Sequence, residues 1–364
     1  MILVYSDSKI IDSEWIPSII FPGPIEVCHD FDYYINSTVA IKIAFTTDRF
    51  ALLQCHRHSN IQFNDKIVQL SKNSNFVFNV MNEFHYNEVV HWIENYQDNI
   101  YYLYPGAVRD NKLSSLSISF PDWFRTTADV YRQLLPILNQ LSPYDTKTKY
   151  FDALLGSPKP HRDFIYKAVQ LSDLENKIEM VYGGYWKNNN CYVPALNFIY
   201  EKDIEILDKH NPLVYHTMSK TKYHGTYCLL SQVIPIEVFN NTAYSIVAET
   251  DCDNALSFFT EKTAKPLIAR RLFVAFSGYK FLYNLKKLGF KTFDNVIDES
   301  YDLIEDTSQR LTAAFEQVKY LCSVPQEKIL YKIKDITEHN YNHIMNTNWT
   351  KYSCDQINRI IKIL

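Results

Sequence analysis

Residues 244–276 read YSIVAETDCDNALSFFTEKTAKPLIARRLFVAF, two apolar runs separated by a polar loop and a helix-start signal. The runs at 244–248 and 271–276 are rich in β-branched and aromatic residues, which is typical of buried strands. Thr260 directly follows Phe258 and Phe259. It stands where a helix N-cap is preferred, at the start of the segment that leads to the second run. Strand, helix and strand in this order predict a parallel βαβ unit.

The same rhythm extends outward from this stretch. In the first half, short β-rich runs such as MILVY and TVAIKIAF alternate with helical segments. In the second half, YFDALLG precedes a helix predicted from Asp163 to about Asn176, and the strand-like run IEMVYGGYW follows. Successive α/β units of this kind predict an α/β fold with two Rossmann-like domains.

The predicted organisation has three parts. A chain of 364 residues is long enough for two cores. The first domain is predicted at 1–145 and the second at 146–338, with the boundary near the proline that ends DWFRTTADVYRQLLPILNQLSP. The segment 339–364 ends in an amphipathic helix, which we expect to pack back on the first domain.

Composition excludes several classes of protein. No apolar run approaches the roughly 18 residues of a membrane span, and the N-terminal stretch lacks the features of a signal peptide, so we expect a cytoplasmic protein. A net charge of −4 argues against charge-driven binding to nucleic acid or an anionic membrane. The seven cysteines form no CxxC pair and indicate reduced thiols.

Glycine is unusually rare, with 8 residues in the chain. Neither GxGxxG nor GxxxxGK[ST] occurs, so a bound nucleotide would depend on helix N-termini and side chains. The abundance of Tyr, Phe, Asn and Ile is the bias of an A/T-rich genome. It suggests a bacterium, a phage or a large virus. For a phage or a virus, the cytoplasm would be that of the host.

The segment Thr260-Glu261-Lys262 has two interpretations. A hydroxyl cap followed by an early carboxylate is what any helix start prefers. Lys262 does not fit this simple account, because a cation in the first turn opposes the helix dipole. With the dipole it would instead form a positive site for a phosphate, and Glu261 would accept hydrogen bonds from a ribose.

A second basic junction lies at LLGSPKPHRDFIYKAVQL. Gly156 is followed by Lys159, His161 and Arg162 just before the predicted helix. A guanidinium and backbone N–H groups at one helix end suit a diphosphate. A solvated basic loop is the alternative interpretation of this segment.

The run from Ala243 to Phe276 resembles the donor-binding motif of α-1,3-fucosyltransferases and exostosin-like enzymes. In that motif a strand ending in Phe-Glu-Asn precedes a Tyr-x-Thr-Glu-Lys helix start and then another strand. The resemblance implies a GT-B fold, with two Rossmann-like domains facing a cleft. It also implies donor-binding roles for Glu249, Glu261 and Lys262.

Further expectations follow from this resemblance. The donor would be a nucleotide-sugar, bound by the second domain, and Arg162 would act as the arginine that ends a glycine-led turn. Transfer would invert the anomeric configuration and require neither a metal nor another cofactor. The acceptor, a glycan or a modified DNA base, would bind the first domain.

The sequence departs from the motif in two places. Thr250 stands where Asn is usual, and KPLIARRLF replaces the small residues after the helix. Pro266 is expected to kink or shorten that helix. These departures concern the identity of the sugar more than the fold.

The general base is sought in the first domain. In FVFNVMNEFHYNEV, Glu83 and His85 lie between a predicted strand and helix, and a carboxylate there would take the acceptor's proton. Asp30, Asp32 and His29 compete from another strand end. Ordinary helix-start polarity explains each of these residues equally well.

Several other features are given structural interpretations. Asp251 and Asp253 form a literal DxD, but such spacing is frequent in polar loops. The pairs His56/His58 and His339/His343 would bind zinc only with further ligands. The acidic group at 298–302 either contacts sugar hydroxyls or solvates a helix start, and we favour the second reading. A non-catalytic nucleotide- or glycan-binding protein is the alternative function, and a hydrolase or kinase is disfavoured because GxSxG and P-loop motifs are absent.

Overall fold

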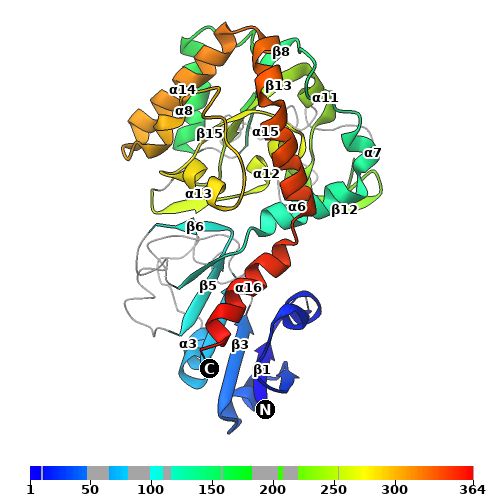
Figure 1. The fold of residues 1–364 in the computed structure, drawn as a ribbon, viewed down its shortest axis with the longest axis vertical. Helices are drawn as coiled ribbons and strands as arrows, with labels where there is room; N and C mark the ends of the chain where they lie inside the picture. Colours follow the sequence, from blue (N-terminus) through cyan, green and yellow to red (C-terminus); the bar gives the residue numbers. More distant parts are fainter. Residues whose placement is uncertain are drawn as a thin grey trace. The chain divides into compact units, whose positions relative to one another are not determined.

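The structure is a computed structural model that describes residues 1–9, 11–46, 65–80, 99–109, 116–156, 159–182, 204–207, 220–252 and 254–363. The chain forms two compact units, of which the first comprises Met1–Asp122 with Asn348–Leu364 and the second Trp123–Thr347. Each unit has its own parallel sheet with helices packed on it (Figure 1). The predicted α/β class is therefore confirmed.

The first unit contains a six-stranded sheet in the order β2-β1-β3-β4-β5-β7. All neighbours pair in parallel, so every strand ends at the same edge. Most of its strands are buried on both faces, which explains why their sequences are continuous apolar runs. The strands are β1 (Ile2–Ser6), β2 (Ile25–Cys28), β3 (Ile41–Thr46), β4 (Phe76–Val80), β5 (Ile100–Tyr104) and β7 (Ser117–Ser119), with the short β6 (Gly106–Val108) beyond β5.

Helices cover this sheet, and the C-terminal helix is one of them. Helix α16 (Trp349–Ile361) crosses the strands in Figure 1, and its Cys354, Ile357 and Ile361 share one buried cluster with side chains of β1, β3 and β4. Burying each isoleucine contributes about 1.5–3 kcal/mol, which explains why an amphipathic final helix docks here. The other helices among the described residues of this unit are η1 (Ile11–Trp15), η2 (Ile16–Ser18), α1 (Phe31–Asn36) and α3 (Asp65–Asn73).

The second unit contains a four-stranded parallel sheet in the order β15-β13-β8-β9. Its strands are β8 (Lys149–Leu155), β9 (Ile178–Tyr182), β13 (Thr242–Ala248) and β15 (Phe273–Phe276). A small antiparallel sheet consists of β10 (Ile204–Ile206), β11 (Lys220–Tyr223) and β12 (Thr226–Leu229), and the short β14 is Leu256–Phe258.

Helices α8 (Pro160–Leu171) and α12 (Glu261–Ile268) are the crossovers that position the candidate site. Helix α8 begins earlier than predicted, because Pro160 suits the first helical position. It also ends earlier than predicted, at Leu171. Pro266 lies inside α12, which ends two residues later, as a proline-shortened helix should. The remaining helices are α6 (Asp122–Gln133), α7 (Leu135–Leu138), η4 (Leu230–Gln232), α11 (Ile236–Asn241), α13 (Phe281–Lys287), η5 (Glu299–Leu303), α14 (Thr307–Ser323) and α15 (Gln326–Asn346).

The compact units divide the chain at other residues than the predicted ranges 1–145, 146–338 and 339–364. The second unit begins at Trp123, so residue 145 lies inside it. Helix α6 packs in this unit, where the Tyr131 hydroxyl donates to the Gln232 carbonyl at 3.1 Å. Residue 339 lies inside α15, and the chain rejoins the first unit at Asn348. None of the described helices combines the length and hydropathy of a membrane span.

Each parallel sheet has one switch point, where successive crossovers leave in opposite directions. In the second unit β8 connects outward to β9, whereas β13 connects outward to β15, so the switch lies between β8 and β13. In the first unit it lies between β1 and β3, since β1 leads to β2 on one side and β3 leads to β4 on the other. Open α/β sheets bind ligands in the crevice outside the strand ends at such a point.

Candidate functional site

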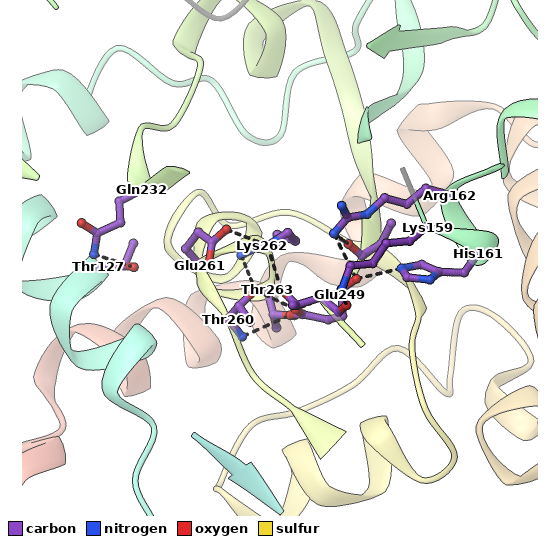
Figure 2. A network of polar contacts seen from close by, with 12 residues as sticks. Thr127, Lys159, His161, Arg162, Gln232, Glu249, Thr260, Glu261, Lys262 and Thr263 are labelled. Carbon is purple, nitrogen blue, oxygen red and sulfur yellow. Dashed lines mark hydrogen bonds and ion pairs between the residues drawn. The ribbon is translucent and has the colours of Figure 1, made fainter. Parts of the chain in front are cut away.

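The candidate site of the second unit lies at its switch point. Strand β13 ends at Ala248, and the first residues after it meet the N-terminal ends of α8 and α12 (Figure 2). Sequence analysis chose these same two helix starts as its basic junctions. The register that pairs β13 with β8 brings them together.

Glu249 is the buried centre of this site. Its side chain is 0% exposed, and its carboxylate accepts four hydrogen bonds. The donors are the Thr250 N–H (3.1 Å), the Thr260 N–H (3.2 Å), the Thr260 hydroxyl (2.6 Å) and the Thr263 hydroxyl (2.5 Å). Burial raises the pKa of Glu249, and Lys262 and the threonine hydroxyls oppose that rise. With its oxygens enclosed, Glu249 fixes the start of α12.

The predicted N-cap of α12 is confirmed. The Thr260 hydroxyl accepts a hydrogen bond from the Lys262 N–H at 3.2 Å, and the Thr260 carbonyl accepts from the Thr263 N–H at 3.2 Å. Together with the bond from the Thr260 N–H to Glu249, these contacts occupy most first-turn donors. A phosphate here would therefore be bound mainly by side-chain cations, with a smaller contribution from backbone N–H groups than the sequence suggested.

The charged group of Lys262 is more accessible than that of its neighbour Glu261 in α12. Its side chain is 26% exposed, and Nζ contacts Glu261 Oε1 at 2.8 Å and the Thr250 hydroxyl at 3.1 Å. Glu261 is 6% exposed; burial raises its pKa, but the nearby Lys262 and Lys265 outweigh this effect, so the net shift is downward. Glu261 is therefore a carboxylate held in its charged form beside Lys262.

The basic residues of α8 approach the same loop from the other side (Figure 2). Lys159 Nζ donates to the Thr250 carbonyl at 2.5 Å, and Arg162 donates to the Glu249 carbonyl at 3.3 Å. His161 is buried, with Nε2 2.8 Å from the Glu249 carbonyl, and burial and then Arg162 lower its pKa to about 3. His161 is thus a neutral donor that holds the loop in place.

Thr250 connects the two basic groups, and sequence analysis treated it only as a departure from a motif. Its N–H, carbonyl and hydroxyl bond Glu249, Lys159 and Lys262 respectively. The two ammonium groups thereby converge on one residue from separate helices. The only sequence signal for this role was its place directly after a strand-end carboxylate.

A neutral polar pair lies on the Glu261 side of the site. In Figure 2 Thr127 and Gln232 lie beyond Glu261, and Gln232 Nε2 donates to the Thr127 hydroxyl at 3.4 Å and to the Thr126 hydroxyl at 3.1 Å. Both Thr127 and Gln232 are buried. Sequence analysis missed this pair, because α6 had been placed in the first domain.

A second charged cluster lies at the opposite end of β13. Arg271 and Asp152 form a buried ion pair at 2.9 Å, with side chains 3% and 5% exposed. Every guanidinium nitrogen of Arg271 has a partner: Ser245 Oγ, Asp152 Oδ1, Thr242 Oγ1, and the carbonyls of Phe239, Thr242 and Tyr244. This cluster joins β8 and β13 to Arg271, which lies two residues before β15, and it leaves no guanidinium donor of Arg271 for a ligand.

The residues proposed as the general base have different outcomes. Glu83 and His85 lie outside the described residues. Asp30 is the N-cap of α1, accepting from the Tyr33 N–H at 2.9 Å, which supports the helix-start reading. Asp32 lies in the first turn of the same helix, and His29 Nδ1 lies 3.0 Å from the Ser6 carbonyl.

The remaining polar features are mainly structural. His339 and His343 contact the carbonyls of Gly289 and Leu288, at the end of α13. Asp298 caps η5, Glu299 bonds the Phe293 N–H, and Asp302 accepts from the N–H groups that begin α13, as the favoured reading expected. His56, His58 and Asp253 lie outside the described residues. No group of three or more His, Cys, Asp or Glu side chains suited to a metal occurs among the residues that the structure describes.

No protein-family model matches this sequence, and no curated protein matches it significantly.

Proposed function

We propose that the protein is a glycosyltransferase that transfers a sugar from a nucleotide-sugar to a hydroxyl acceptor. The observation that carries this proposal is the convergence of Lys159 and Lys262 on Thr250, at the switch point of the second unit. Two ammonium groups from separate helices complement the two charges of a diphosphate. The resemblance of residues 243–276 to fucosyltransferase donor motifs supports the same assignment.

Positive charge at this point would act on the leaving group. As the acceptor oxygen bonds to the anomeric carbon, the acceptor hydroxyl gives its proton to a general base. The bond from that carbon to the diphosphate oxygen breaks, and its electron pair stays on the nucleoside diphosphate. Lys159 and Lys262 would stabilise that developing charge, as a metal ion does in other transferases. We propose inversion at the anomeric carbon, as the resemblance to fucosyltransferases implies.

The donor-site residues take two kinds of role in this proposal. Lys159, Lys262 and Glu261 would contact the donor, the last through ribose hydroxyls. Arg162, Glu249 and Thr260 would hold the loop and the helix start, because Arg162 donates to the Glu249 carbonyl and the Glu249 and Thr260 side chains bond the first turn of α12. The two α/β units would correspond to the two domains of a GT-B enzyme, and a glycan or modified nucleobase would be the acceptor.

The first experiment measures nucleotide binding by thermal shift with UDP-, GDP-, TDP- and CMP-sugars. A bound donor should raise the melting midpoint through mass action. Lys262→Ala and Lys159→Ala should each abolish that rise. Lys319→Ala is the matched control, since this exposed lysine of α14 pairs with Glu316 in the preceding turn.

Turnover separates the transferase from the alternative function. A transferase should release free nucleoside diphosphate from the donor that it binds, slowly into water and faster with an acceptor. Binding without release under any acceptor would favour a non-catalytic nucleotide-binding protein. Absence of binding to the whole panel would refute the transferase and a nucleotide-binding protein, and would leave the glycan-binding alternative.

A further inference from the structure

The first unit has polar side chains at its own switch point, between β1 and β3. Thr46 is the last residue of β3, and its hydroxyl donates to Asp7 Oδ2 at 2.7 Å, just after the end of β1. Asp7 is solvent-exposed. A carboxylate therefore stands at the edge of the sheet where this class of fold binds ligands.

Asn79 extends this polar group to the next strand. The register of β3 and β4 makes Thr46 and Asn79 direct cross-strand partners, so their side chains lie about 5 Å apart on one face. That face points away from α16, because Phe78 and Val80 on either side of Asn79 belong to the apolar cluster under that helix.

The Asn79 side chain is buried without full hydrogen bonding. The residue is 1% exposed, and its Oδ1 has no hydrogen-bond partner in the part of the chain that the structure describes. An unpaired buried polar atom costs about 1–3 kcal/mol and is rare in native proteins. Such an atom beside a carboxylate at a strand end indicates that a ligand supplies the missing donor.

The chemistry of this group selects the ligand. Asp7 contributes carboxylate oxygens and Asn79 an amide oxygen, all of which accept hydrogen bonds. These groups complement neighbouring hydroxyls and disfavour phosphate, in contrast to the lysines of the second unit. A neutral polyhydroxylated molecule of the sugar class fits both acceptors.

We propose that Asp7 and Asn79 form a second ligand site, which binds hydroxyls of a sugar-class molecule, and that Thr46 positions Asp7. This inference rests on the proposed function in one respect, namely that the ligand would be the acceptor of the transfer. Asp7 then replaces Glu83 as the carboxylate of the first unit that contacts an acceptor hydroxyl.

Saturation-transfer NMR with the full chain and a panel of methyl glycosides tests the proposal. The wild-type protein should bind at least one glycoside, and Asp7→Asn should weaken that binding about tenfold or more, the effect of losing a hydrogen bond to a charged group. Asp355→Asn is the matched control, a carboxylate of α16 in the same unit whose side chain is 48% exposed and pairs with Lys351, and it should bind like wild type.

Asn79→Leu separates ligand binding from a structural role. It should also abolish glycoside binding, yet leave the melting midpoint unchanged or higher, because it removes an unpaired polar atom from a buried position. A marked loss of stability in Asn79→Leu would show that the amide serves the fold, and would overturn its role as a ligand.

Other outcomes overturn the site as a whole. These are the absence of any glycoside binding to wild type, unchanged binding in Asp7→Asn, and Asp7-dependent binding of Mg²⁺ or Ca²⁺ in place of glycosides. The thermal shift with nucleotide-sugars is measured on the same protein variants. Nucleotide binding with Asp7-independent glycoside binding would refute only this site, whereas Asp7-dependent glycoside binding without nucleotide binding would refute only the proposed transferase.

Discussion

The two ends of strand β13 carry contrasting charged clusters. At the amino end, Arg271 and Asp152 are enclosed, and each guanidinium nitrogen is paired with the protein. At the carboxyl end, Glu249 is equally enclosed, but Lys262 remains partly exposed and reaches a single side-chain carboxylate and a hydroxyl. The difference shows that burial of charge alone does not mark a binding site; a site needs charge that the fold leaves accessible.

The amino-end cluster should dominate stability. Arg271→Met leaves Asp152 buried without its partner, which should lower the free energy of unfolding by about 3–5 kcal/mol. Urea denaturation of the variant and wild type measures the difference. Replacing Asp152 by Leu in the same protein should recover part of the loss, and a single-variant effect below about 1 kcal/mol would contradict a closed structural cluster.

Glu249→Ala should give the next largest effect. It removes the acceptor of four donors around the start of α12, and we expect a loss of about 3 kcal/mol in unfolding free energy. Glu249→Gln keeps one oxygen and should lose less. If chemical denaturation gave equal values for wild type and both variants, the carboxyl end would not be organised around Glu249.

His161 sharpens the comparison through pH. Its pKa is about 3 in the folded protein and near 6.5 when unfolded, so its contribution is complete above about pH 6.5 and is lost as the pH falls toward 3. At pH 5 the wild-type protein should have lost about 2 kcal/mol through this residue. Denaturation of His161→Gln at pH 7 and pH 5 should show a correspondingly flatter pH dependence; identical slopes would contradict a buried neutral imidazole.

Thr250→Val should have the smallest effect on stability and a clear effect on nucleotide binding. The change removes the hydroxyl that holds Lys262 but keeps the carbonyl that holds Lys159, so unfolding free energy should change by less than about 1 kcal/mol. Calorimetric titration with UDP, GDP and TDP should show severalfold weaker binding than wild type for the nucleotide that binds, with recovery in Thr250→Ser. Equal affinity in the valine variant would remove Thr250 from the site.

Local signals predicted much of this architecture. The parallel α/β arrangement, the N-cap at Thr260 and the shortening of α12 by Pro266 all follow from side chains close together in the chain. The spacing of its apolar residues likewise predicted the amphipathic final helix, and this helix packs on the first unit.

Long-range pairing was not predictable in the same way. Asp152 and Ser245 are 93 residues apart in sequence and are hydrogen-bonded in the core. The sequence left open whether Arg162 binds a diphosphate or belongs to a solvated loop, and only the structure shows that it is buried against the backbone after β13. Asp7 carried no motif at all, because its position matters only once β1 and β3 are neighbours.

By itself the sequence determined which segments become strands and helices, and which helix starts are rich in cations, because periodicity and capping act within a few residues. Only the tertiary structure decided which charges are enclosed and which stay accessible. That outcome depends on the order of strands in each sheet, and desolvation together with the partners thus supplied fixes whether a charged group serves the fold or remains available to a ligand.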